Sequence, residues 1–297
     1  MIVARSASEL EAAERSVAIG TFDGVHRGHR AVIEAAATTG LRSTVVTFEP
    51  HPRLVLGYEV ELITSLERRI ELIREIGPDE LLVVEFTPDL SRKEPEAFAA
   101  DVLGAIGTRV VVTGEDFRFG AGRRGDVELL RRLGLDVRPV PLLERASSSL
   151  VRELVHEGDL RGAAGLLGRP FELEGLVVAG DQRGGTLGFP TANLALDAHA
   201  LVPAYGIYAG ETLGHRAAAS VGVNPHYGGS ERRVEAFLLD FEGDLYGRRL
   251  RLELWERLRE ERAFASEDEL VAQIARDVEA ARAATRPGDE KRSAKSS

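Results

Sequence analysis

The 297-residue sequence contains no cysteine, which excludes disulfide bonds, thiolate catalysis, and zinc or iron–sulfur sites with cysteine ligands. Lysine is nearly absent as well, since only Lys93, Lys291 and Lys295 occur among 38 basic residues. No Gly-x-x-x-x-Gly-Lys-[Ser/Thr] segment is present, so a P-loop is excluded. Any polyphosphate bound by this chain must therefore be neutralised by arginine, by helix N-termini or by a metal ion.

Long apolar runs are also missing. No stretch approaches the roughly 20 residues needed to span a bilayer, and Met1–Leu10 lacks the apolar core of a signal peptide. We therefore expect a cytoplasmic protein without a membrane partner. The net charge of −10 disfavours a nucleic-acid partner, because such proteins usually present a basic surface. A hydrophobic content of 43% is typical of a globular protein, and the length suits two domains.

Short β-branched runs alternate with helical patterns in the first half of the chain. The predicted strands cover residues 16–19, 43–48, 81–86, 109–113 and 135–140, and the predicted helices cover 28–38, 66–76, 95–106 and 127–133. This alternation predicts an α/β domain with a parallel sheet flanked by helices. Ligands of such open sheets bind beyond the carboxyl ends of the strands.

The pattern changes in the second half. From Phe171 to Leu254, short alternating runs are broken by Gly, Pro and Asn, which predicts an antiparallel barrel or sandwich. An amphipathic helix over Ser266–Ala284 opens with a capping box. We place the boundary at Gly168, which gives domains of residues 1–168 and 169–285. Residues 286–297 have no apolar pattern and are predicted to form a disordered tail.

The segment Gly20-Thr21-Phe22-Asp23-Gly24-Val25-His26-Arg27-Gly28-His29 joins the first predicted strand to the first predicted helix. A phosphate at this helix start would meet free N–H groups, the positive end of the helix dipole and two imidazoles. Gly28 would remove a Cβ that obstructs close approach. These donors suit nucleotidyl transfer, in which charge builds on phosphoryl oxygens. Two exposed loop histidines, or two metal ligands, are the alternatives.

Two further segments of the first half carry side chains suited to a nucleotide or planar ligand. Ser147-Ser148-Ser149-Leu150-Val151-Arg152 starts a later helix, where the serines alone indicate ordinary capping but, with the histidines, favour phosphate binding. Asp116 and Phe117 directly follow a predicted strand. An aromatic ring there could stack on a planar ligand, or it could close the core of the sheet.

The second half contains the segment Asp181-Gln182-Arg183-Gly184-Gly185-Thr186-Leu187-Gly188-Phe189-Pro190-Thr191-Ala192-Asn193. Its glycines would permit close approach to phosphates, and the Thr191 hydroxyl and Asn193 amide are hard oxygen ligands suited to Mg²⁺. A hairpin loop without a ligand fits equally well. Glu235 lies in an apolar run, where a carboxylate could accept a proton from an alcohol or could lie on the solvated face of an edge strand.

Together and in this order, the motifs resemble those of the prokaryotic bifunctional riboflavin kinase/FMN adenylyltransferase (FAD synthetase) family, from about Val17 to Arg282. The resemblance implies an N-terminal Rossmann-like nucleotidyltransferase domain that converts FMN and ATP into FAD and pyrophosphate. It also implies a C-terminal antiparallel riboflavin kinase barrel, with a terminal helix, that makes FMN from riboflavin and ATP. The implied partners are riboflavin, FMN, FAD and the co-substrate ATP, with Mg²⁺ as cofactor, and a homo-oligomer is left open.

The resemblance assigns roles by position. In the adenylyltransferase, His26 and His29 would stabilise the ATP phosphates, with further contacts from Gly20, Phe22, Asp23, Gly28, Ser147, Ser148, Ser149 and Arg152. In the kinase, Glu235 would be the catalytic base, with ATP contacts from Gly180, Gly188, Thr191 and Asn193, and Thr191 and Asn193 would hold the metal. The flavin would contact Asp116, Phe117, Arg259 and Phe264. The chain departs from the family pattern at Ser149, where Thr is usual, at Gly185 (Arg) and at His226 (Thr).

Two other functions fit part of the sequence. An adenylyltransferase with another acceptor, such as nicotinamide mononucleotide or phosphopantetheine, would share the His-x-Gly-His motif but leaves the second domain unexplained. A non-catalytic flavin sensor or carrier would not need to retain His26, His29, Thr191, Asn193 and Glu235 together.

Overall fold

The computed structural model of the chain describes residues 1–141, 146–180, 189–223 and 232–289. Its contacts divide the chain into two compact units, Met1–Val60 with Thr64–Ser147, and Glu61–Ile63 with Ser148–Ser297. Helices α7 (Ser148–Glu157) and α8 (Leu160–Leu167) belong to the second unit. The boundary predicted at Gly168 follows both helices. The contacts place them with the barrel because their apolar side chains join its core, including Val151, Val155 and Leu160.

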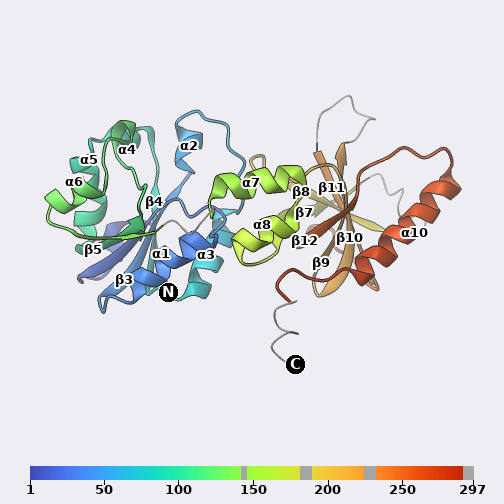
Figure 1. The fold of residues 1–297 in the computed structure, drawn as a ribbon, viewed down its shortest axis with the longest axis horizontal. Helices are drawn as coiled ribbons and strands as arrows, with labels where there is room; N and C mark the ends of the chain where they lie inside the picture. The colour runs from blue at the N-terminus through green and yellow to red at the C-terminus, as the bar shows by residue number, and fades with distance from the viewer. Residues whose placement is uncertain (142–145, 181–188, 224–231, 290–297) are drawn as a thin grey trace. The chain divides into compact units, whose positions relative to one another are not determined.

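The first unit contains a six-stranded sheet in the order β1-β4-β3-β2-β5-β6 (Figure 1). Every neighbouring pair is parallel. The strands are β1 (Ile2–Ala4), β2 (Arg15–Ile19), β3 (Arg42–Glu49), β4 (Glu80–Glu85), β5 (Thr108–Gly114) and β6 (Asp136–Val140). The predicted α/β class is confirmed. The sequence analysis missed edge strand β1, because three residues are too few to show a period.

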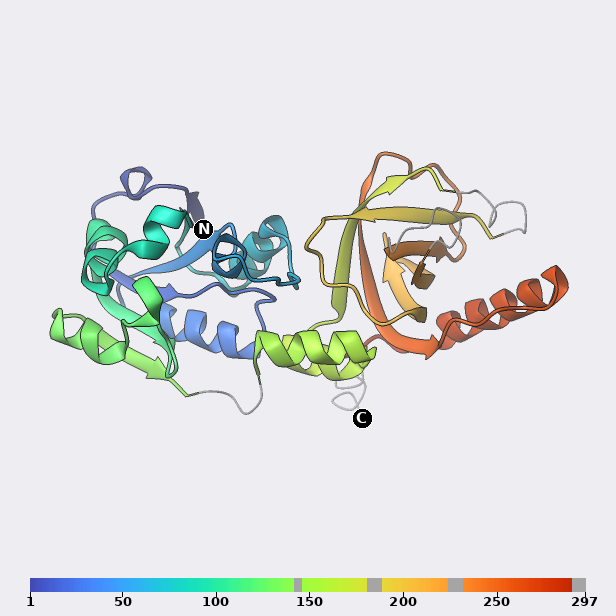
Figure 2. The ribbon, with the colours of Figure 1, turned by 90° about the horizontal axis from the view of Figure 1, so that it is seen from above.

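Helices cover both faces of this sheet, as Figure 2 shows. The α-helices of this unit are α1 (Arg27–Ala37), α2 (Pro52–Val55), α3 (Leu66–Ile76), α4 (Pro88–Arg92), α5 (Pro95–Phe98) and α6 (Val127–Arg132). Strand β2 is buried throughout, with Val17 in one apolar cluster and Ala18 in the other. Two-sided burial explains why the strands appear in the sequence as continuous apolar runs.

The position of β2 defines a ligand-binding edge. β3 pairs with it on one side and β5 on the other, so the strand order reverses there. Ligands of open α/β sheets bind beyond the carboxyl ends of the strands at such a point. The Gly20–His29 segment begins at that end of β2.

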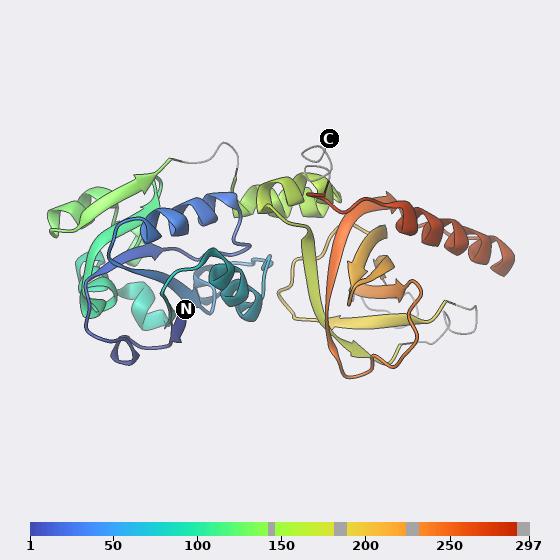
Figure 3. The same ribbon diagram turned by 90° about the horizontal axis from the view of Figure 1, so that it is seen from below.

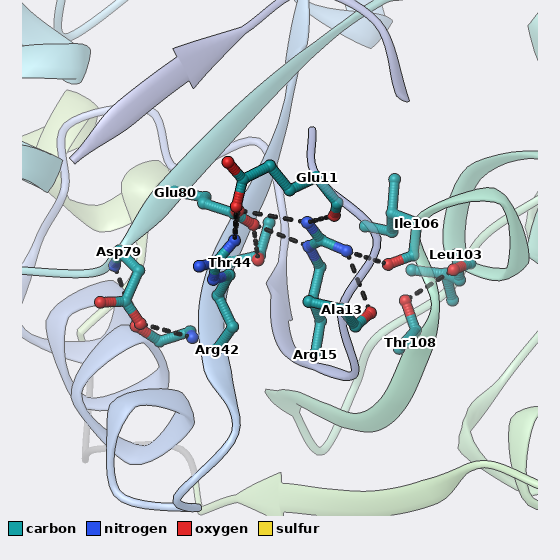
Figure 4. A network of polar contacts seen from close by, with 11 residues as sticks. Glu11, Ala13, Arg15, Arg42, Thr44, Asp79, Glu80, Leu103, Ile106 and Thr108 are labelled. Atoms are coloured by element: carbon teal, nitrogen blue, oxygen red, sulfur yellow. Dashed lines mark hydrogen bonds and ion pairs between the residues drawn. The ribbon is translucent and has the colours of Figure 1, made fainter. Parts of the chain in front are cut away.

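A buried ionic network occupies the amino end of the same sheet (Figure 4). Arg15 and Glu80 are each 1% exposed, and Arg15 Nε donates to Glu80 Oε2 at 2.7 Å. Arg15 Nη2 donates to Glu80 Oε1 at 3.1 Å, and Arg15 Nη1 donates to the Ile106 main-chain carbonyl at 2.7 Å. Thr44 Oγ1 donates to Glu80 Oε2 at 2.8 Å. Burial alone would raise the pKa of Glu80, but the hydrogen bonds from Arg15 and Thr44 outweigh it and lower that pKa.

Replacing Glu80 with glutamine should cost about 3 kcal/mol of unfolding free energy at neutral pH, because it leaves the buried Arg15 charge uncompensated. The pKa of Glu80 lies below the unfolded value of about 4.3. The ionised carboxylate therefore stabilises the fold above that pH, and its contribution is lost as the pH falls through the lowered folded pKa. Urea unfolding of both proteins between pH 7 and pH 3 measures the difference.

The control is Glu14→Gln, since Glu14 pairs with Arg109 across the surface and both side chains are more than half exposed. That pair should contribute less than about 1 kcal/mol. Equal losses for the two variants, or a Glu80→Gln loss that does not shrink in acid, would contradict the account.

The second unit is a closed antiparallel barrel in the order β10-β11-β8-β7-β12-β9 (Figure 3). Its strands are β7 (Phe171–Val178), β8 (Thr191–Leu196), β9 (Gly206–Thr212), β10 (His215–Val223), β11 (Arg232–Leu238) and β12 (Arg249–Arg259). Of the two predicted architectures, the barrel is confirmed. β12 runs five residues past the predicted end at Leu254, with register shifts that let it pair with both β7 and β9 and so close the barrel.

The two faces of the barrel differ in chemistry. Val234, Ala236 and Leu238 alternate along β11 and fill the interior. The terminal helix α10 (Glu267–Ala283), which is confirmed, packs on the outer face, where Ala281 meets Trp255. Arg286 donates two hydrogen bonds to Glu253 at 2.7 Å, so contacts of this unit extend into the predicted tail, of which residues 290–297 lie outside the described part. No helix in the described ranges combines the length and apolar composition that a bilayer crossing requires.

Candidate active sites

The two histidines of the first signature lie together at the start of α1. His26 is the N-cap of the helix, and its Nδ1 accepts a hydrogen bond from the His29 amide at 3.3 Å. The rings stack with centroids 3.6 Å apart and planes 18° from parallel. Because Nδ1 is an acceptor, a neutral His26 carries its proton on Nε2.

Gly28 makes room for the His26 ring. A Cβ at Gly28 would lie 3.1 Å from His26 Cε1 and 3.3 Å from the Ala146 carbonyl oxygen, both tighter than ordinary contact. The absent side chain therefore lets the imidazole fold back over the helix start. The approach of a phosphate, the other role that the sequence predicts for this glycine, stays a prediction.

The residues between β2 and α1 shape the loop from within. Phe22 is 1% exposed, and its ring meets the His29 ring edge-on at 5.2 Å. A Cβ on Gly20 would lie 3.2 Å from the Phe22 ring. Asp23 is 2% exposed, and its Oδ1 accepts hydrogen bonds from the Thr64 amide at 3.1 Å and from the Thr64 hydroxyl at 3.3 Å. Nothing in the sequence points to this role of Thr64, since a Thr-Ser pair before a helix indicates only capping.

The serine-rich segment spans the division of the chain. Ser147 ends the first unit, while Ser148 and Ser149 begin α7 in the second, so a helix does start within this segment. Arg152 Nε donates to the Glu61 main-chain carbonyl at 2.6 Å. One nitrogen of Arg152, which is predicted to bind phosphate, is thus already hydrogen-bonded within the second unit.

The predicted flavin side of the first unit is aromatic. Asp116 is exposed in the turn after β5, and Phe117 is partly buried and stacked on Phe119 at 5.6 Å. Phe119 packs against Phe98 in the core. Closure of the core therefore accounts for Phe119, while Phe117 lies at its margin and retains an exposed part.

The second signature meets Glu235 on the outer face of the barrel. Thr191 Oγ1 donates to Glu235 Oε2 at 3.1 Å, and Asn193 is the direct cross-strand neighbour of Glu235. β11 is bordered by β8 and β10, so Glu235 is not on an edge strand. It is half-buried between the inward residues Val234 and Ala236, which explains a carboxylate in an apolar run.

Gly180 lies directly against the Asn193 side chain. A Cβ at Gly180 would come within 2.1 Å of Asn193 Nδ2, so a larger residue would have to displace that amide. The structure thus brings Gly180, Thr191, Asn193 and Glu235 to one region. Gly188, Gly185 and His226 lie outside the described residues.

Arg259 and Phe264, the predicted flavin contacts of the second unit, are also neighbours, with the guanidinium 5.7 Å from the ring centroid. Arg259 binds both carboxylate oxygens of the buried Asp277, with the shortest distance 2.7 Å from Nη2 to Oδ2. Gln273 donates to the same carboxylate at 2.8 Å. Arg259 therefore joins the end of β12 to α10, a function that its spacing from Phe264 does not indicate.

The similarity to known proteins extends over most of the chain. A family model described as FAD synthetase matches residues 8–150, and one described as Riboflavin kinase matches residues 167–285. The bifunctional riboflavin kinase/FMN adenylyltransferase of Escherichia coli (strain K12) is 38% identical over 284 residues, covering 89% of this chain and 90% of that protein. The chain belongs to the bifunctional riboflavin kinase/FMN adenylyltransferase family.

Another relative and one solved structure are also similar to this chain over most of its length. The protein of that name from Listeria monocytogenes is 35% identical over 288 residues, covering 90% of this chain and 91% of that protein. A solved structure from Streptococcus pneumoniae, described as a macrolide-efflux protein, has a TM-score of 0.86 and 30% identity, and the match covers 96% of this chain and 99% of that one. Both modules of the family are thus present in one chain.

Proposed function

We propose that this chain phosphorylates riboflavin to FMN in its barrel unit and adenylylates FMN to FAD in its parallel-sheet unit, using ATP in both steps. Family membership over both modules supports the pair of activities. The observation that carries the proposal is the presence of two separate reactive groupings. One is the His26–His29 stack at the start of α1, and the other is the Thr191–Glu235 hydrogen bond on the barrel.

In the adenylyl transfer, a phosphate oxygen of FMN attacks the α-phosphorus of ATP, and the bond to pyrophosphate breaks. A phosphate monoester is largely dianionic at neutral pH, so the attack needs no general base. His26 Nε2 and the His29 ring would donate to the phosphoryl oxygens as charge builds on them. Ser147, which belongs to the same unit, would contribute a phosphate contact, and Asp116 and Phe117 would face the flavin.

In the kinase step, the ribityl hydroxyl of riboflavin attacks the γ-phosphorus of ATP, and the bond to ADP breaks. An alcohol, unlike a phosphate, loses a proton as it attacks, and Glu235 would accept it. The carboxylate is held by Thr191 at 3.1 Å and is half-buried, so it can meet a substrate on the outer face. Phe264 and Arg259 would lie on the flavin side.

The donors near Glu235 suit Mg²⁺. Thr191 offers a hydroxyl and Asn193 an amide oxygen, both hard ligands, and Gly180 leaves the Asn193 amide room against the chain. In the described ranges, no group of three or more His, Asp or Glu side chains is placed to hold a metal. When bound, the ion would neutralise phosphate charge.

Flavin product analysis tests the proposal. The protein with riboflavin, ATP and Mg²⁺ should form FMN first and FAD later, separated by chromatography and identified by mass. A matched reaction with excess chelator should form neither, because both steps need neutralised triphosphate. Absence of both products from the complete reaction would refute the proposal, and FMN without FAD would refute its adenylyl-transfer half.

A further inference from the structure

The loop that carries the two histidines is conformationally strained. Phe22 has a φ of 51° and Val25 a φ of 40°, values in the left-handed region that bulky and β-branched side chains rarely adopt. Such conformations persist only where the surrounding structure holds them, and they are concentrated at functional sites. The question is which residues hold this loop.

Two residues at the start of α3 bind the loop on both sides of Phe22. Thr64 binds the Asp23 side, because its amide donates to Asp23 Oδ1 at 3.1 Å and its hydroxyl accepts from the Gly24 amide at 3.1 Å. Arg69 binds the other side, because its Nη1 donates to the Thr21 carbonyl at 2.8 Å. The strained residue therefore lies between two fixed points.

Arg69 is itself fixed by the carboxyl end of β3. Its side chain is 2% exposed, and Nη2 donates to Glu49 Oε2 at 2.6 Å. Nη1 also reaches the Phe48 carbonyl at 3.3 Å, and Thr47 Oγ1 donates to the same Thr21 carbonyl at 3.0 Å. One guanidinium thus ties the ends of β2 and β3 at the edge where the nucleotide would bind.

We propose that Arg69 is a positioning residue for adenylyl transfer, and this role rests on the function proposed above. Arg69 fixes the Thr21 carbonyl, which sets the backbone of Phe22, and the Phe22 ring supports His29 at 5.2 Å. Loss of the guanidinium frees the strained loop to relax, and His29 leaves the position from which it would meet the phosphates. Misplacement of about 1 Å can cost about 10²-fold in rate.

The same sheet provides a matched control. Arg15 is likewise buried and bound to a glutamate, Glu80, but at the amino end of the strands (Figure 4). If Arg69 only stabilised the fold, replacing it should affect kcat for FAD formation no more than replacing Arg15. Arg69→Met and Arg15→Met are therefore compared for unfolding by urea, for kcat and KM in FMN adenylylation, and for riboflavin phosphorylation.

For Arg69→Met, we expect kcat for FAD formation to fall about 10²-fold. The KM for ATP should change less than kcat. The rate of riboflavin phosphorylation should stay within about twofold of the wild-type rate. Arg69→Lys should recover part of the loss, because an ammonium can reach one acceptor but not bridge two. Arg15→Met should lose at least as much stability, yet keep kcat for FAD formation within about threefold of wild type when both variants are compared as folded protein.

Equal kcat losses for the Arg69→Met and Arg15→Met proteins would overturn the role. If Arg69→Met does not fold, Glu49→Gln decides, because it weakens the contact that fixes Arg69 and should lower kcat about tenfold by weakening a charge-assisted bond. An unchanged kcat in that variant would also overturn the role. If the wild-type protein makes no FAD, the proposed adenylyl transfer is itself wrong. If the wild-type protein makes FAD and the Arg69 variants make it equally fast, only the positioning role of Arg69 is wrong.

Discussion

Replacing Glu235 with glutamine should stop riboflavin phosphorylation while leaving the conversion of supplied FMN into FAD at the wild-type rate. Glutamine keeps the volume of the side chain and an oxygen that can accept from Thr191, whose hydroxyl lies 3.1 Å from the carboxylate. It cannot take the proton of the ribityl hydroxyl. Loss of a general base typically lowers the rate by about 10²–10⁴-fold. Initial rates of FMN and FAD formation, measured separately by chromatography, check the result.

A second carboxylate on the outer face of the barrel provides the control for losing one negative charge there. Glu174 on β7 is also half-buried and pairs with Arg251 at 3.1 Å, within the same barrel. Glu174→Gln should leave both rates within about twofold, since paired carboxylates near a surface contribute little. Normal FMN formation by a folded Glu235→Gln protein would remove the proposed base.

Replacing His29 with alanine should have the opposite effect: FMN should accumulate from riboflavin, and FAD formation should fall about 10²–10³-fold. The His29 ring is the more exposed member of the stack, while its amide, not its side chain, donates to His26. The substitution therefore removes a phosphate donor without removing the helix cap. Alanine at His26 would remove both the phosphate donor and the helix cap, so a loss of activity there could not be told from a loss of stability. Rates with FMN and ATP as substrates measure the effect.

His199→Ala is the matched control, because His199 is exposed and contributes its main-chain carbonyl to the fold. It should change neither activity. A His29→Ala protein that forms FAD at the normal rate would show that the stacked pair does not act on the nucleotide.

Local patterns predicted the architecture well where burial leaves a clear mark in the sequence. The strands of the sheet appear as continuous apolar runs because both of their faces are buried, and helix α10 appears as an amphipathic pattern because one of its faces packs on the barrel. β8 was not predicted, since Thr191–Leu196 follows a glycine-rich segment that favours a loop. These residues form a strand because they pair with β7 on one side and β11 on the other, which are contacts that the local sequence does not show.

The candidate sites divide in the same way. His26, His29, Thr191 and Glu235 belong to short motifs whose chemistry is visible in the sequence. Arg69 does not, because an arginine in an amphipathic helix normally indicates a solvated face, and its partners Thr21 and Glu49 come from other elements. The link of Arg259 to Asp277 has the same cause, since Asp277 lies on α10, and only the closed barrel brings the pair together.

If two independent sites act in sequence on one chain, flavin product analysis of Glu235→Gln and His29→Ala, each supplied with riboflavin or with FMN, should separate them. Glu235→Gln should make FAD from FMN at the normal rate but form FMN from riboflavin about 10²–10⁴-fold more slowly. His29→Ala should convert riboflavin to FMN at the normal rate but form FAD about 10²–10³-fold more slowly. Loss of both activities in either folded variant would contradict the presence of two independent sites.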